Sequence, residues 1–303
     1  MPENEIVTII GAGPAGIAAA IYLQRAGLHP LVLERDEIGG LLRNANLVEN
    51  YPGFPEGISG SDLVNLLRRH LMGLNIRIRK ETVTAVRRSG AGFLIEANSR
   101  SFESRFVVVA SGTHPIIPSI RGLSPLLGKR IFSSIVELPK DAVGKKILIL
   151  GGGDAAFDYA LSLKERGHSP IVVSRSKPHC LPLLLARVRA GNIPVLADCA
   201  PTSIRSNKEG ISLGLKARKT AKNLTGDLMI LACGRTPNLD FLDRAILRRI
   251  DTTKGKSERI VDGLYLVGDA VGGKYRQTGI AVGNGLLAGM HIEQLTRKRR
   301  AKE

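Results

Sequence analysis

The stretch that decides the fold is KKILILGGGDAAFDYALSLKERGHSPIVVSR, residues 145–175. It reads as an apolar strand, three adjacent glycines, an Ala-rich amphipathic segment, a break at Gly167 and a second apolar strand. The same order occurs 140 residues earlier in EIVTIIGAGPAGIAAAIYLQRAGLHPLVLER, residues 5–35, where the break is Gly27. Each stretch is expected to form a βαβ unit of about 30 residues. The sequence therefore predicts an α/β protein with two Rossmann-like dinucleotide-binding domains.

The glycines between strand and helix predict a dinucleotide-binding turn in each unit. In the first unit Gly11 permits the tight turn, Gly13 lets the backbone approach a pyrophosphate, and Gly16 allows close packing of helix on strand. In the second unit residues 151–153 form the turn, and Ala156 stands at the third small position. The N-terminus of each helix offers free N–H groups to phosphates. One such motif alone would be weak evidence, whereas two with matching spacing indicate two nucleotide sites.

The residue at the end of each second strand indicates which nucleotide each site prefers. Glu34 lies 23 residues after Gly11, and a carboxylate there accepts hydrogen bonds from a ribose 2′-OH. The same spacing from Gly151 ends at Ser174, which Arg175, Ser176 and Lys177 follow. The first site fits FAD or NAD. The second favours NADPH, unless its two cations are ordinary solvated charges.

A third motif near the C-terminus completes the first pocket. In GLYLVGDAVGGKYRQTGIAVGNGLLAGMHIEQL, residues 263–295, an apolar strand leads to Gly268 and Asp269, and a helix rich in small residues is expected from about Thr278. An aspartate after such a strand can bind a ribityl hydroxyl, and a helix N-terminus can face the flavin ring. Alone, this segment would be a plain strand–loop–helix.

Composition argues against a disordered protein, a membrane protein and a disulfide-rich or metal-binding protein. Hydrophobic residues make up 43% of the 303 residues and there are 34 glycines, which is typical of a folded α/β protein. The uncharged run 6–23 is expected to be a buried strand, turn and helix, not a membrane span. Three scattered cysteines, Cys180, Cys199 and Cys233, predict neither a disulfide framework nor a metal site. We expect a soluble cytoplasmic protein.

Along nearly its whole length the chain resembles the low-molecular-weight thioredoxin reductases. This resemblance implies an FAD-binding domain formed by residues 1–112 and 238–303, an NAD(P)H-binding domain inserted at 113–237, and a homodimer. The motifs that carry it are GAGPAG at 11–16, LER…GG at 33–40, ENYPGFPEGISG at 49–60, VVVASGTHP at 107–115, GGGDAA at 151–156, CGRTPN at 233–238 and LVGDA…YRQTGIA at 266–281.

The resemblance also implies a set of binding residues for each nucleotide. For FAD they are Gly11, Gly13, Pro14, Ala15, Gly16, Glu34, Arg35, Gly40, Leu41, Asn50, Ala110, Gly112, Gly268, Asp269, Arg276, Gln277 and Thr278. For NAD(P)H they are Gly152, Gly153, Asp154, Ala155, Arg175, Ser176, Lys177, Gly234 and Arg235. The family's basic motif reads His-Arg-Arg followed by another Arg, whereas this chain has Ser174-Arg175-Ser176 and Cys180. NADPH is the expected nucleotide, and NADH stays open.

The larger departure lies where thioredoxin reductases carry their redox-active Cys-x-x-Cys. The matching residues here are Ser134-Ile135-Val136-Glu137, and no C-x-x-C occurs in the chain. Disulfide exchange needs an attacking thiolate, so the usual relay is not expected. The thioredoxin-reductase-like ferredoxin/flavodoxin–NADP⁺ reductases also lack this pair, although this chain ends at Glu303 without their C-terminal extension.

The charge balance suggests a partner. The formal net charge is +17, with basic clusters at 68–69, 77–80, 216–222 and 297–300. Such a surface would steer an acidic electron carrier such as ferredoxin or flavodoxin, unless the charge serves only solubility. The expected function is an FAD-dependent NAD(P)H oxidoreductase. A non-catalytic basic binding protein and a reductase of a thioredoxin-like partner by a non-standard route stay open, while the lack of nucleic-acid motifs argues against RNA or DNA.

Overall fold

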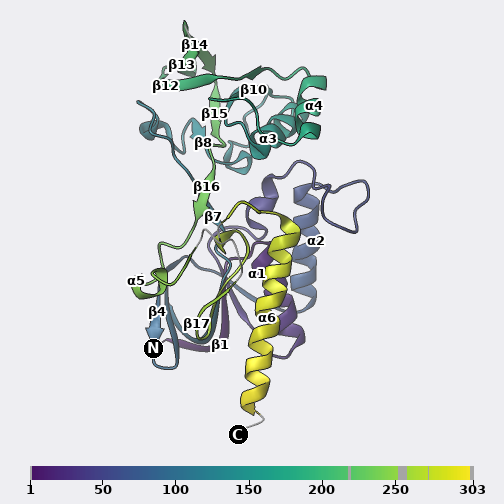
Figure 1. Ribbon diagram of the computed structural model, residues 1–303, viewed down its shortest axis with the longest axis vertical. Helices are drawn as coiled ribbons and strands as arrows, with labels where there is room; N and C mark the ends of the chain where they lie inside the picture. Colours follow the sequence, from purple (N-terminus) through teal and green to yellow (C-terminus); the bar gives the residue numbers. More distant parts are fainter. Residues whose placement is uncertain (1, 218–219, 252–257, 272, 301–303) are drawn as a thin grey trace. The chain divides into compact units, whose positions relative to one another are not determined.

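The computed structural model of the protein describes residues 2–217, 220–251, 258–271 and 273–300. Two compact units are present, and unit 1 contains both ends of the chain (Figure 1). Unit 1 comprises Met1–Arg43, Glu49–His114 and Thr236–Glu303, and unit 2 comprises Asn44–Val48 and Pro115–Arg235. The short segment Asn44–Val48 belongs to unit 2 although its neighbours on both sides belong to unit 1, which no sequence pattern indicated.

A mixed sheet forms the centre of unit 1. Five parallel strands follow the order β18-β6-β1-β2-β3, β17 pairs antiparallel with β18, and the β4–β5 hairpin continues antiparallel from β6. The strands are β1 (Glu3–Ile10), β2 (Leu31–Glu34), β3 (Arg77–Lys80), β4 (Val83–Ser89), β5 (Gly92–Ala97), β6 (Ser101–Val109), β17 (Glu258–Val261) and β18 (Leu264–Leu266).

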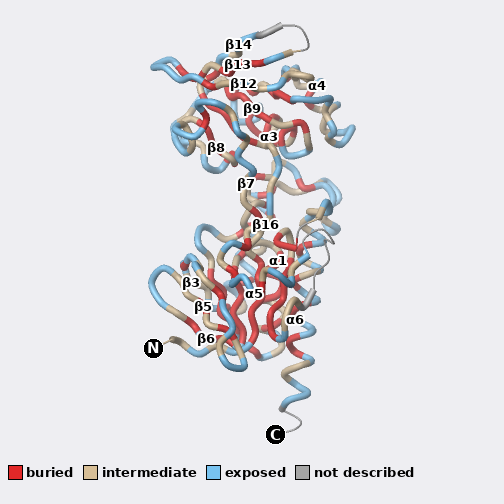
Figure 2. The backbone as a smooth tube through the Cα atoms, turned by 60° about the vertical axis from the view of Figure 1, so that its left-hand side comes forward, coloured by how far each residue is buried: buried red, intermediate tan, exposed pale blue. Residues whose placement is uncertain are grey.

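Alternation along the central strands supplies both faces of this sheet. Val7, Ile9 and Val108 belong to the cluster under the long helices, whereas Ile10 and Val109 belong to the cluster on the opposite face. The register pairs Ile9 with Val108 and Ile10 with Val109, so like side chains share a face. Figure 2 shows these strands as largely buried. A sheet covered on both faces explains why residues 7–10 and 106–110 carry no charge.

Two long helices pack side by side on one face of that sheet, α1 (Pro14–Arg25) and α6 (Thr278–Arg300) (Figure 1). A Cβ atom on Gly285 would overlap the carbonyl oxygen of Ala15, and one on Gly289 would lie 2.9 Å from the ring of Tyr22. These two glycines, one turn apart, therefore let α6 approach α1 closely. The remaining helices of unit 1 are α2 (Gly60–Gly73) and α5 (Arg244–Leu247), with short 3₁₀ segments η1 (Gly40–Asn44) and η4 (Gly268–Val271).

Unit 2 contains a parallel sheet in the order β11-β10-β9-β15-β8 and a separate antiparallel sheet, β12-β13-β14. Phe157 packs with Ile147 and Ile149 on one face, whereas Leu148 and Leu213 pack on the other. The elements are β8 (Ile131–Phe132), β9 (Lys146–Leu150), β10 (Ser169–Val173), β11 (Val195–Leu196), β12 (Cys199–Ser206), β13 (Ile211–Ala217), β14 (Thr220–Gly226), β15 (Leu228–Leu231), α3 (Asp154–Glu165), α4 (Pro182–Ala190), η2 (Ser124–Leu126) and η3 (Ile135–Glu137).

The chain leaves unit 1 through β7 (Thr113–Pro115) and returns through β16 (Arg235–Pro237), and these two strands pair with each other. The α/β class and the two βαβ units predicted from the sequence are confirmed, and the uncharged run 6–23 forms most of β1, the turn and most of α1. Within the described ranges, no helix is both long enough and apolar enough to cross a membrane.

Candidate nucleotide-binding sites

The first glycine turn connects β1 to α1. Gly11 has φ +104°, and a Cβ atom there would overlap the carbonyl oxygen of Ala110. A Cβ atom on Gly16 would overlap the carbonyl oxygen of Gly11, so both positions require glycine. Gly13 differs, because its φ is −76° and a Cβ atom there would meet nothing within 4 Å. Gly13 is also the N-cap of α1, and no side chain caps that helix end, so no side-chain oxygen takes up its first N–H groups. This turn fits a pyrophosphate.

Glu34, at the end of β2, is bonded to the first turn. Its Oε2 accepts a hydrogen bond from the N–H of Ala12 at 2.6 Å, and its Oε1 accepts one from the N–H of Asp36 at 2.9 Å. A carboxylate accepts both hydrogen bonds, so each is stronger than a hydrogen bond between neutral groups. The carboxylate is thereby fixed beside the turn, where it could also accept a hydrogen bond from an adenosine ribose.

Several other predicted FAD residues gather around the first turn. A Cβ atom on Gly40 would lie 3.4 Å from the Cα of Gly13, and one on Gly268 would lie 2.7 Å from the Cβ of Ala15. Ala110 and Gly112 follow the end of β6. Pro14 begins α1, the exposed Arg35 follows Glu34, Leu41 lies in η1, and Asp269 lies in η4. The half-buried Arg276 lies two residues before α6, and the half-buried Thr278 begins that helix.

Asn50 and Gln277 are brought together although 227 residues separate them. The side-chain amide of Asn50 donates to the side-chain oxygen of Gln277 at 2.8 Å. Both residues are exposed, so the pair can be reached by a ligand. The flavin-binding roles of these residues stay predictions.

The second turn, between β9 and α3, repeats the bonds of the first at an offset of 140 residues. The N–H of Gly11 donates to the carbonyl oxygen of Leu33 at 2.8 Å, and that of Gly151 donates to Val173 at 2.9 Å. A Cβ atom on Gly151 would overlap the carbonyl oxygen of Ala232, as one on Gly11 would overlap that of Ala110. Gly153 is the N-cap of α3, and no side chain caps that helix either. The repeat seen in the sequence is therefore a repeat of structure.

What covers the second turn differs from what covers the first. Ser174, at the position of Glu34, is buried, and a Cβ atom on Gly152 would overlap its hydroxyl oxygen. The hydroxyl of Ser174 therefore lies against the turn and not in the loop that follows. Arg175, Ser176 and Lys177 are all exposed on that loop.

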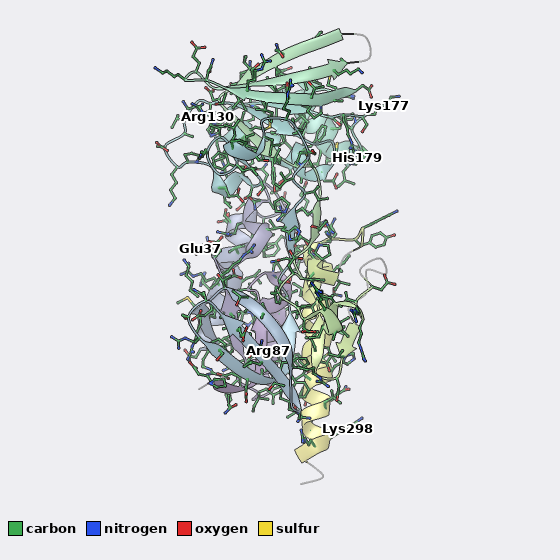
Figure 3. The ribbon with its side chains drawn as sticks, turned by 90° about the vertical axis from the view of Figure 1, so that its left-hand side faces the viewer. Glu37, Arg87, Arg130, Lys177, His179 and Lys298 are labelled. Atoms are coloured by element: carbon green, nitrogen blue, oxygen red, sulfur yellow. The ribbon has the colours of Figure 1, made fainter. Side chains whose placement is uncertain are left out.

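Two contacts of this loop were missed by sequence reasoning. Asp154, predicted as a nucleotide ligand, accepts a hydrogen bond from the N–H of Leu181 at 2.7 Å through its Oδ1, and so ties the loop to α3. His179 donates its backbone N–H to the carbonyl oxygen of Gly152 at 2.8 Å. Lys177 and His179 lie on the same side of unit 2 (Figure 3). The exposed Ala155 follows in α3, and Gly234 (φ +104°) and Arg235 lie at the start of β16.

The position of the missing cysteine pair is occupied by η3 and its N-cap. Ser134 is 4% exposed, and its hydroxyl donates to Oδ1 of Asn44 at 2.6 Å. The carboxylate of Glu137 accepts hydrogen bonds from the backbone N–H and the hydroxyl of Ser133, both at 3.0 Å. Hydrogen bonds thus engage both Ser134 and Glu137, the residues predicted to stand in place of the two cysteines.

The three cysteines are free, and burial disfavours the thiolates of Cys180 and Cys233. Burial raises the pKa of Cys233 to about 11 and also raises the pKa of Cys180. The thiol of Cys199 donates to the carbonyl oxygen of Ala197 at 3.3 Å. Within the described residues no cluster of metal-ligating side chains is present.

Comparison with known proteins identifies the family of the chain. Residues 6–285 match the pyridine nucleotide-disulphide oxidoreductase family, and the chain belongs to that family. The thioredoxin reductase of Mycolicibacterium smegmatis is 29% identical over 299 residues, covering 95% of each chain. The bifunctional thioredoxin reductase/thioredoxin of Mycobacterium leprae is 30% identical over 298 residues, and the match spans 95% of this chain but 65% of that protein.

Solved structures show the same fold. The thioredoxin reductase of T. acidophilum superimposes with a TM-score of 0.85 at 27% identity, covering 97% of this chain and 99% of that one. The Lactococcus lactis thioredoxin reductase gives a TM-score of 0.86 at 26% identity with the same coverage. The chain is therefore a thioredoxin reductase-like oxidoreductase with two Rossmann-like domains.

Proposed function

We propose that this protein is an FAD-dependent NAD(P)H oxidoreductase that passes electrons to an external acceptor without an internal dithiol. The observation that carries the proposal is the pair Ser134 and Glu137 at the positions of the redox cysteines. Both nucleotide turns are intact beside this loss, and a protein without turnover would have no need for the second turn. NADPH is the proposed donor, with NADH as the alternative.

FAD, when bound, supplies an acceptor for the two electrons of NAD(P)H and can release them singly or in pairs. The residues of this chain serve to bind and orient, since that step needs no protein acid or base. Glu34 would accept from the adenosine ribose while it holds Ala12 in place. The open N-terminus of α1 at Gly13 would hold the pyrophosphate. Asn50 and Gln277 would lie at the flavin end.

The remaining thiols are poor substitutes for the relay. Thiol–disulfide exchange needs a thiolate, and the raised pKa values of Cys180 and Cys233 keep both thiols protonated at neutral pH. Cys199 and Cys233 also direct their sulfur atoms to backbone carbonyl oxygens. A route through these cysteines is therefore disfavoured.

The proposed acceptor is an acidic electron carrier, on the strength of the net charge of +17. Two of the four basic clusters give this argument less support than the sequence suggested. In the cluster at 77–80, Arg77 pairs with Glu5 and Arg79 pairs with Glu3 at 2.7 Å, so this cluster is partly neutralised. In the cluster at 216–222, residues 218–219 lie outside the described residues. The support that remains includes the exposed Arg68 and Arg69 on α2 and the exposed Lys298 near the end of α6 (Figure 3).

The test is an acceptor screen with the purified flavoprotein under argon. NADPH should bleach the yellow protein, and the reduced protein should turn over with a neutral quinone and with an acidic ferredoxin or flavodoxin. The rate with the acidic carrier should fall steeply as ionic strength rises above about 0.1 M, while the quinone rate stays constant. A variant with all three cysteines changed to serine should retain both activities.

Each alternative has its own outcome. The named activity of the relatives favours thioredoxin as a second candidate partner, and NADPH-dependent reduction of thioredoxin, lost in the cysteine-free variant, would establish a thiol route. A carrier rate that does not depend on salt would refute electrostatic docking and favour a small acceptor. A purified protein that lacks flavin, or is not bleached by NADPH, would favour a non-catalytic basic binding protein. The homodimer stays a prediction.

A further inference from the structure

The loop after β10 folds back over the second glycine turn and places a histidine ring there. A Cβ atom on Gly153 would lie 3.2 Å from Nε2 of His179, and one on Gly152 would lie 3.4 Å from its Cε1. Two hydrogen bonds fix this arrangement: the N–H of His179 to the carbonyl oxygen of Gly152 at 2.8 Å, and the N–H of Leu181 to Asp154 at 2.7 Å. The histidine is nevertheless exposed, so a ligand can reach its ring.

The first unit provides an internal comparison. At the offset of 140 residues, His179 corresponds to Gly39, whose N–H donates to the carbonyl oxygen of Ala12 at the same 2.8 Å. The two loops therefore return to their turns through the same bond. In the first unit this residue has no side chain and nothing lies within 4 Å of a Cβ on Gly13. In the second unit the equivalent space, beside Gly153, holds an imidazole.

In a dinucleotide-binding turn of this kind, that space would hold the pyrophosphate. The N-terminus of α3 carries the positive end of the helix dipole, and no side chain caps it. A histidine adds a side-chain N–H donor, neutral or protonated, to the backbone N–H groups of the turn. We infer that His179 binds the pyrophosphate of the pyridine nucleotide, alongside Gly153. This inference rests on the proposed NAD(P)H site at this turn.

The inference assigns the two phosphate-bearing groups of the nucleotide to different parts of one loop. The pyrophosphate is common to NADP⁺ and NAD⁺, so a contact from His179 contributes to both. The 2′-phosphate occurs in NADP⁺ alone, and the exposed Arg175 and Lys177 at the start of the loop are its proposed ligands. Adenosine 2′-phosphate carries the second group without the first. Three ligands can therefore separate the two contacts.

The experiment measures dissociation constants of NADP⁺, NAD⁺ and adenosine 2′-phosphate for the flavoprotein, with His179→Phe and Arg175→Ala as matched variants on one loop. His179→Phe keeps a ring and removes the donor. It should weaken NADP⁺ and NAD⁺ by the same factor, about tenfold or more, and leave adenosine 2′-phosphate unchanged. Arg175→Ala should weaken NADP⁺ and adenosine 2′-phosphate and leave NAD⁺ unchanged. His179→Gln, which restores a side-chain N–H, should recover part of the loss.

The contrary outcomes are distinct. If the wild-type protein binds both dinucleotides and His179→Phe binds them equally well or more tightly, the ring is a passive or obstructing cover and the inference fails while the proposed function stands. If the wild-type protein binds neither dinucleotide, the proposed site fails and the inference falls with it. Unchanged binding of adenosine 2′-phosphate by His179→Phe, and of NAD⁺ by Arg175→Ala, shows that unit 2 is intact in each variant, so a selective loss belongs to the nucleotide contact.

Discussion

Replacing Gly13 by alanine adds one methyl group to the first turn, at a position where a Cβ atom would meet nothing within 4 Å. Its φ of −76° and ψ of 178° suit alanine as well as glycine. Alanine is a poorer N-cap than glycine, which costs about 0.5–1 kcal/mol, and the less flexible unfolded chain offsets about as much. The stability of the flavin-free protein should therefore change by less than about 1 kcal/mol.

The same methyl group should weaken flavin binding strongly. It would project into the space that the pyrophosphate needs in order to reach the N-terminus of α1. Loss of one charge-assisted phosphate contact costs roughly 1.5–3 kcal/mol, so the dissociation constant for FAD should rise about ten- to a hundredfold. Gly13→Ala therefore separates binding from folding.

Gly16→Ala, in contrast, should lower the stability of the flavin-free protein. Its new methyl group would overlap the carbonyl oxygen of Gly11 and lie 3.2 Å from the Cβ of Ala110. Both obstacles belong to the turn and the strand beneath it, so relief requires backbone movement, and we expect a loss of about 1–3 kcal/mol or more in stability. Gly73→Ala, at the exposed end of α2 with nothing within 4 Å, is the matched control and should leave both properties unchanged.

The assay is thermal unfolding of each deflavinated protein, followed by titration with FAD. A Gly13→Ala protein that binds FAD as tightly as the wild type would refute the placement of the pyrophosphate over this residue. A Gly16→Ala protein with wild-type stability would refute the packing argument.

Two further predictions concern single carboxylates. Glu34→Gln should raise the dissociation constant for FAD about tenfold, because it weakens the charge-assisted hydrogen bond from Ala12 and replaces the carboxylate that would accept from the ribose. Glu37→Gln, at an exposed position, is the control and should leave that constant unchanged. Equal flavin titrations of the two variants would contradict this role of Glu34. Burial raises the pKa of Asp158 from 3.8 to about 6, despite N–H donors from Asn46 and Leu47. The folded protein therefore binds this proton more tightly, and the resulting stability is lost as the pH rises through about 6. Urea unfolding from pH 4 to pH 7.5 should show the wild type losing roughly 2 kcal/mol relative to Asp158→Asn, and a pH-independent difference would contradict the raised pKa.

The repeat was readable from the sequence because both turns depend on local rules. Glycine at a positive φ, a short helix-forming segment and a strand of apolar residues each leave a mark within about 30 residues. The structure adds that equivalent residues of the two units make equivalent hydrogen bonds, as Gly39 and His179 do. A consistent offset in the sequence therefore predicted backbone geometry, although not the side chains placed on it.

The side chains that the sequence could not place depend on contacts between distant segments. Arg77 and Arg79 read as part of a basic cluster, but β3 lies one strand away from β1, and that order lets them reach Glu5 and Glu3. The position of His179 similarly depends on the hydrogen bond of the loop to Asp154 in α3. Charge and residue type were visible in the sequence, whereas the partners were fixed by topology.

The missing relay is a difference in local structure and not only in two residue types. Ser134 donates to Asn44 from a buried position, and Val136 donates its backbone N–H to the same oxygen at 3.2 Å. Replacing Ser134 by cysteine would exchange a strong hydroxyl donor for a weak thiol donor beside a buried amide oxygen, at a cost of about 1 kcal/mol or more. Replacing Glu137 would also remove the carboxylate that holds the backbone and hydroxyl of Ser133. The hydrogen bonds that order η3 are thus made by the residues that stand in place of the cysteines, so restoring a dithiol would remove the contacts that position it. These contacts are consistent with the proposed transfer of electrons directly from the cofactor site to an external acceptor.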